Sequence, residues 1–275
     1  MEHHTPATKA QIVYFSHGGG PLPILGDASH RAMVTFMRDL PGALARPEAI
    51  VVISAHWEEP EATLLGAAAP PMLYDYYGFP EAAYTIIYPA PGEPQLAERI
   101  TDALQRQGIA ASIDNTRGFD HGLFIPLALM FPQADIPALQ CSLLRGLDPA
   151  AHLALGRALR TFLPENLLVI GSGFSFHNMG AFDWQGANRS DPANDAFQDW
   201  LIETCTDAMP ESEREQRLID WESAPSARYC HRRVEHLLPL HVCQGLAGRP
   251  ARVLFDDHIL GKRAIALGWQ ASSAR

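Results

Sequence analysis

The stretch QIVYFSH (residues 11–17) is the first of three short apolar runs that each lead into a histidine. The second covers residues 49–55 and runs into His56, and the third covers residues 167–170 and continues through GSGFSF to His177. Their length and their β-branched residues are typical of buried strands. If the strands lie parallel, their carboxyl ends share the sheet edge where open α/β folds bind ligands. The sequence therefore predicts a histidine cluster at that edge.

Strand and helix patterns alternate along the rest of the chain. Expected helices span residues 28–40, 96–107, 123–130, 150–162, 193–208, 212–221 and 231–246, and further strands span 109–113, 138–144, 252–255 and 264–269. Pro239 lies inside the last helix, which should therefore begin late or be kinked. The alternation predicts an α/β fold: a single domain with a mostly parallel central sheet flanked by helices and an active site at the carboxyl ends of the strands. We expect a flexible tail over residues 1–10, which includes His3 and His4, and one catalytic domain over residues 11–270.

Composition narrows the class of protein. The 275 residues carry a formal net charge of −10, which argues against nucleic acid or an anionic membrane as partner. Four cysteines lie far apart without a CxxC pair, so we expect reduced thiols. No basic and apolar leader opens the chain, and no apolar run approaches the ~18 residues that span a bilayer. We therefore expect a cytoplasmic protein.

The histidines divide into two groups. His17, His56 and His177 end predicted strands, and His121 and His236 lie among glycine, proline or acidic neighbours. The other histidines of the expected domain need no function, and they are His30, His152, His231, His241 and His258. Neutral imidazoles that converge at a sheet edge suit Zn²⁺ or Fe(II).

Glu235-His236 supplies a third ligand for such a site. Adjacent residues on a helix point about 100° apart, so only one of the pair can face a metal. Glu235 would complete two histidines and one carboxylate, the facial triad of non-haem Fe(II) oxygenases. His236 would instead give a three-histidine set, which zinc sites also use. The residues alone leave both alternatives open.

An aromatic, loop-like segment, YDYYGFP (residues 74–80), precedes Tyr84 and YPAPG (residues 88–92). It is either a lid packed on the domain or a wall for a planar aromatic substrate, and its spacing favours neither. Arg117 could pair with a carboxylate, although a lone arginine in a loop is more often solvated.

Several motifs, taken together and in order, resemble one family. They are SHGGGP (16–21), VISAHW (52–57), YGFP (77–80), YPAPG (88–92), GFDHG (118–122), GSG (171–173) with His177-Asn178, and EHLLPL (235–240). The chain resembles the class III extradiol ring-cleaving dioxygenases of the DOPA-dioxygenase type, in the LigB-like superfamily, from about Ile12 to Trp269.

This resemblance implies a metal held by His17, His56 and His236, with His177 beside it as a fourth imidazole. In some branches of the superfamily a carboxylate takes the third place, so Glu235 is the reserve ligand. Fe(II) is expected for activity, and Zn²⁺ can replace it in the purified protein. Many relatives have His-Gly-Ser-Pro where this chain reads HGGGPLP (17–23), a difference that concerns substrate preference more than metal binding.

The implied reaction is the extradiol opening of a catechol ring, DOPA-like or related, with both atoms of O₂. His177 would accept a proton from the catechol, and His177 or His121 would return one later. His121 would lie close to the substrate, and Tyr77 and Phe79 would bind it.

Two rivals use the same residues. One is a zinc-dependent hydrolase in which His17, His56 and His236 activate a water. The other is a non-catalytic metal-binding interaction protein, which would not need the histidines at all five positions. The remaining expectations are a small-molecule substrate, no nucleic acid or membrane partner, and possible homo-oligomers.

Overall fold

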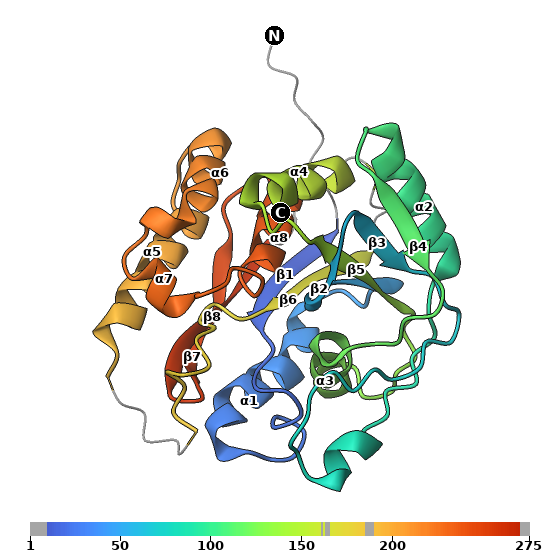
Figure 1. Cartoon of the computed structure of the whole chain (residues 1–275), viewed down its shortest axis with the longest axis horizontal. Coiled ribbons are helices and arrows are strands. Elements are labelled where there is room, and N and C mark those ends of the chain that lie inside the picture. Colours follow the sequence, from blue (N-terminus) through green and yellow to red (C-terminus); the bar gives the residue numbers. More distant parts are fainter. Residues whose placement is uncertain (1–9, 161, 163–165, 185–189, 270–275) are drawn as a thin grey trace.

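A single twisted sheet forms the centre of the molecule in the computed structural model, which describes residues 10–160, 162, 166–184 and 190–269 (Figure 1). Within these residues the strand order is β4-β3-β5-β2-β6-β1-β8-β7. The strands are β1 (Gln11–Ser16), β2 (Ala49–Glu59), β3 (Ala62–Leu65), β4 (Ala111–Asp114), β5 (Ala138–Leu144), β6 (Leu167–Gly173), β7 (Arg252–Ile259) and β8 (Lys262–Trp269). The tail expected over residues 1–10, with His3 and His4, lies outside the described residues except for Ala10.

The four central strands run parallel. Strand β6 pairs in parallel with both β1 and β2, and β2 pairs in parallel with β5. The register brings Ser172 of β6 opposite both Phe15 and Ser54, so β1, β2 and β6 approach the same sheet edge together. Strand β8 lies between β1 and the edge strand β7 and is antiparallel to both, and β3 is antiparallel to β5. The predicted α/β fold with a mostly parallel sheet is therefore confirmed.

Helices cover both faces of this sheet. They are α1 (Arg31–Asp39), α2 (Pro94–Arg106), α3 (His121–Met130), α4 (Pro149–Arg160), α5 (Pro192–Thr206), α6 (Glu211–Ile219), α7 (Ala227–Cys230) and α8 (Leu238–Ala247). In Figure 1, α4 and α8 pack together on one side of the sheet, and α1 and α3 lie on the other. Because both faces are covered, the central strands are almost continuously apolar and buried, as in other parallel sheets.

Two adjacent residues of β6 show how closely the layers approach. A Cβ at Gly173 would lie 2.1 Å from the carbonyl oxygen of His236, so only glycine lets the chain before α8 rest on this strand. Ser172 points to the opposite face, where its hydroxyl donates to the carbonyl of Gly122 in α3 at 2.5 Å. Strand β6 thus joins the segments that carry His236 and His121.

The element boundaries differ from expectation in informative places. Strand β3 was not predicted, because its four residues, separated from the end of β2 by only two residues, give too short a pattern. The helix expected over residues 231–246 begins late, at Leu238, with Pro239 in its first turn, where the missing N–H costs nothing. The first expected helix opens with a separate 3₁₀ turn, Ala28–His30.

Two further findings concern the helices and the cysteines. No helix among the described residues is long and apolar enough to cross a membrane. All four cysteines are buried and free, which agrees with the expected reduced thiols.

Candidate active site

Three imidazoles from distant parts of the chain converge at the predicted edge. His17 follows β1, His56 lies inside β2, and His236 lies in the turn that leads into α8. The Nε2 atoms of His17 and His56 are 3.0 Å apart. One ring nitrogen of each of the three lies within 4.8 Å of the other two.

The local structure around His56 and His236 differs from the sequence-based expectation in two ways that bear on this convergence. Strand β2 does not end before His56 but continues to Glu59, with a register shift against β5 between Ile53 and Glu58. A bulge of this kind redirects side chains near its position. Glu235 and His236 were expected on a helix but precede it, so the 100° argument does not apply to them.

Polar contacts on the far side of each ring set its orientation. Ser172 Oγ uses its proton on Gly122, so at 3.0 Å it accepts from Nδ1–H of His17. Nδ1 of His236 donates to Oε1 of Glu235 at 2.9 Å, and Nδ1 of His56 faces Oδ2 of Asp75 at 3.5 Å. Each ring therefore carries its proton on Nδ1, and each Nε2 lone pair is left for the centre of the cluster.

Burial keeps these rings neutral. It lowers the pKa of His17, His56 and His236 well below the ordinary histidine range, and the charges of neighbouring imidazoles lower the pKa values of all three further. Neutral nitrogens whose lone pairs face one another at 3.0 Å are repelled unless a cation lies between them. The donor set fits a divalent ion such as Zn²⁺ or Fe(II), and three protein ligands leave coordination positions for small molecules.

Two more histidines border the cluster, each with a carboxylate behind it. The ring of His177 stacks on that of His236, with centroids 3.4 Å apart, and its Nδ1 lies 3.1 Å from Oε1 of Glu235. His121, the first residue of α3, places Nδ1 2.8 Å from Oδ1 of Asp75 and its ring centroid 3.9 Å from that of His56. The structure thus brings together all five histidines that the sequence singled out.

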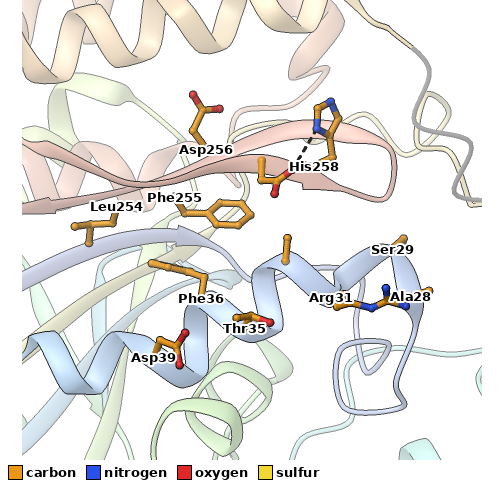
Figure 2. A pocket seen from close by; sticks show the side chains of 12 residues that line it. Ala28, Ser29, Arg31, Thr35, Phe36, Asp39, Leu254, Phe255, Asp256 and His258 are labelled. Atoms are coloured by element: carbon orange, nitrogen blue, oxygen red, sulfur yellow. Dashed lines mark hydrogen bonds and ion pairs between the residues drawn. The ribbon is translucent and has the colours of Figure 1, made fainter.

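The five rings line a cavity of about 360 Å³. Tyr77 and Phe79 line it too, as does Tyr76, whose hydroxyl donates to the carbonyl of Ala83 at 2.6 Å. The aromatic segment is therefore both packed on the domain and part of the cavity wall, and the two alternatives for it are not exclusive. Figure 2 shows a wider pocket elsewhere, of about 840 Å³, between α1 and β7. It contains His258 beside Asp257 and none of the clustered histidines.

Asp75 is a site residue that the sequence argument missed. It contacts two of the clustered imidazoles, and those contacts lower its pKa to about 2, although burial acts in the opposite direction. The available signal was that it is the only acidic residue within YDYYGFP. Ser172 was also missed as a partner of His17, because only the pairing of β1 with β6 brings them together.

The structure corrects the expectation that the side chain of Arg117 is solvated. Its guanidinium donates to the carbonyl of His56 and to Asp120, both at 3.1 Å, and lies 4.7 Å from the ring centroid of Trp57. Asp120 in turn accepts from Ser54 at 2.9 Å and directly precedes His121. This network holds the backbone of both β2 and α3 beside the cluster.

The remaining histidines have structural partners, as expected. Four are fully buried and hydrogen bonded, and His258 is on the surface. Gly19 donates to Nε2 of His30, and Leu144 donates to Nε2 of His152. His231 and His241 contact the carbonyls of Ser175 and Leu218.

A family model described as the catalytic LigB subunit of aromatic ring-opening dioxygenase matches residues 27–262. The chain belongs to this family, and it is accordingly an oxidoreductase of the dioxygenase class that acts on a small molecule with O₂. The matched residues contain His56, His121, His177 and His236, whereas His17 precedes them.

Individual relatives agree with this assignment. The chain is 38% identical to "Dioxygenase tasH" of Hapsidospora irregularis over 96% of this chain and 86% of that one. It is 37% identical to "4,5-DOPA dioxygenase extradiol" of Beta vulgaris (75% and 76% covered) and 32% identical to the protein so named in Escherichia coli K12 (85% and 84%). A crystal structure of an uncharacterized protein from Escherichia coli K12 superposes with a TM-score of 0.75 at 27% identity, covering 94% of this chain and 99% of that one.

Proposed function

We propose that this protein is an extradiol dioxygenase that opens the ring of a catechol at a metal held by His17, His56 and His236. The observation that carries the proposal is the convergence of three imidazoles, with one ring nitrogen of each within 4.8 Å of the others, in the wall of a cavity that aromatic residues also line. Fe(II) in this position would supply the electron transfer between catechol and O₂ that the reaction needs.

His177 is the proposed base for the catechol hydroxyl. Its Nδ1 is held by Glu235, which leaves Nε2 as the nitrogen available to a ligand in the cavity that the ring lines. Imidazole suits this role because it is the side chain that ordinarily gains and loses a proton near neutral pH. Stacking on His236 fixes the ring plane beside the proposed metal ligands.

His121 is the proposed second acid–base group. It lines the same cavity as His177 but comes from a different element, since it begins α3 whereas His177 follows β6. Asp75 accepts from both the backbone N–H of His121, at 3.0 Å, and its Nδ1. Nε2 of His121 is therefore the nitrogen that can give or take a proton at the substrate.

Glu235 supports the ligands in this scheme instead of binding the metal. Its Oε1 already accepts from His236 and His177, which are side by side. Carboxylates behind ligating histidines fix the ring tautomer and raise ligand basicity. The reserve ligand of the sequence argument thus becomes the partner of two imidazoles.

Anaerobic reconstitution with Fe(II), followed by oxygen uptake and absorbance scans over a panel of catechols, tests the proposal. We expect stoichiometric oxygen uptake and a coloured ring-opened product, both lost in His17→Ala. The three-histidine set also fits a zinc hydrolase. Ester or amide hydrolysis by the zinc form, with no oxygen uptake for any catechol, would establish that alternative and overturn the dioxygenase.

A further inference from the structure

We propose that the natural substrate is a catechol with an uncharged, apolar substituent, which lies against Met179, Phe182 and Trp184 at the cavity mouth. The inference rests on the proposed function, because it specifies what the opened ring carries. A substrate of this kind would distinguish this protein from an enzyme that acts on a zwitterionic, DOPA-like substrate.

The cavity changes character from floor to mouth. At the floor, His17 and His236 are 1% and 4% exposed. At the mouth, Tyr77, Met179 and Trp184 are 92%, 56% and 50% exposed, although they are large apolar or aromatic residues. Exposed apolar side chains gathered around one opening mark a surface that a ligand covers.

A row of aromatic rings connects the floor of the cavity with its mouth. The centroid of Phe182 lies 6.5 Å from that of His177 and 5.6 Å from that of Trp184, both edge to face. Phe174, which is buried, packs on Phe182 at 5.3 Å and fixes its position. A substituent that extends outward from a ring held beside His177 would therefore run along Phe182 towards Trp184.

The described residues that line the cavity offer no charged partner to a charged substituent. Among the described residues that line the cavity, none is lysine or arginine, and the only carboxylate is that of Asp75. The oxygens of Asp75 already contact His121 and His56, so they are not available to bind an ammonium group. A carboxylate or ammonium buried without a partner loses its hydration, whereas an alkyl or aryl group gains by leaving water.

Kinetics with matched substrates test this inference. We expect kcat/KM for 4-tert-butylcatechol to exceed that for L-DOPA by at least ~10-fold, the scale on which a hydrophobic pocket discriminates. Trp184→Ala should reduce this ratio several-fold, mainly through KM, and Trp184→Phe should largely restore it. Ile87→Ala is the matched control, because Ile87 is an apolar residue 69% exposed away from the cavity. Met179→Arg should shift the preference towards 3-(3,4-dihydroxyphenyl)propanoate.

Binding to the metal-free protein supplies a readout that does not depend on turnover. Calorimetry should show 4-tert-butylphenol binding at least ~10-fold more tightly than L-tyrosine, with a negative heat-capacity change from apolar burial, and Trp184→Ala should weaken it. Equal or tighter binding of L-tyrosine, or a Trp184→Ala variant that folds but binds unchanged, would overturn the inference. Oxygen uptake that is absent with every catechol would refute the proposed function instead, and the binding preference would still support the apolar mouth.

Discussion

Oε1 of Glu235 lies 2.9 Å from Nδ1 of His236 and 3.1 Å from Nδ1 of His177, so one carboxylate oxygen stands behind two stacked imidazoles. The sequence left open whether Glu235 or His236 is the metal ligand, and this geometry gives the two residues different roles. The imidazole faces the other histidines, and the carboxylate orients it.

Replacement of each member of this pair should give different metal contents. We expect His236→Ala to lose the bound metal, whereas Glu235→Gln should keep it with affinity reduced by roughly 10- to 100-fold, the usual effect of removing a partner behind a ligand. Metal analysis and competition with a chelator measure both. Full metal loss in Glu235→Gln together with retention in His236→Ala would make the carboxylate the ligand.

His177→Ala should separate binding from turnover. Because its Nδ1 is held by Glu235 and its ring lies beside His236, we expect most metal binding to remain and turnover to fall by roughly 10²- to 10⁴-fold, the usual contribution of an acid–base group. Metal content and oxygen uptake are measured on the same sample. Equal losses of the two would instead show that His177 is a ligand.

Ser172→Ala should weaken metal affinity by about tenfold, because His17 then loses the acceptor that sets its tautomer. Ser142→Ala is a suitable control: Ser142 is also a fully buried strand serine, and it accepts from the N–H of Thr63 away from the cluster. Both variants should lose about 1 kcal/mol of unfolding free energy, but only the first should change metal affinity. An unchanged affinity in Ser172→Ala would remove the hydroxyl from the site.

Gly173→Ala should disturb the site through the backbone. The added Cβ would lie 2.1 Å from the His236 carbonyl oxygen, so the turn before α8 must move, and we expect a loss of about 1–3 kcal/mol in stability together with lower metal occupancy. Denaturant unfolding and metal analysis check this. Gly42→Ala has nothing within 4 Å of the new Cβ and should be nearly neutral.

Acid should destabilise the fold through buried neutral histidines. His152 accepts from the N–H of Leu144 on Nε2 and places Nδ1 2.7 Å from the carbonyl of Asp148, and burial lowers its pKa to about 4. In the unfolded chain the pKa is about 6.5, so the unfolded state binds more protons between these values and stability falls as pH falls from 6.5 towards 4.

The expected slope from this residue is about 1 kcal/mol per pH unit within that window. Urea unfolding at several pH values measures it, and His152→Gln should reduce the slope while other buried histidines retain theirs. A slope identical to that of the unmodified protein would show that His152 does not titrate on unfolding.

Local pattern was sufficient for the strands that carry the site. Apolar, β-branched runs predict β1, β2 and β6, and the resemblance of the ordered motifs implied His17, His56 and His236 as a group. Strand β3 and the continuation of β2 past His56 were not predictable, since both depend on pairing with β5 and β4.

The sequence by itself determined the α/β class, the family and the histidines that come together, because these depend on residue type and order along the chain. Tertiary structure alone decided what stands behind each ring. Strand register places Ser172, and the close approach of the chain to Gly173 places Glu235. Asp75 is placed by its loop, which hydrogen bonds through Leu73 to Phe119 just before α3. Hydrogen bonds require positions matched to fractions of an ångström, and only the packed layers supply them.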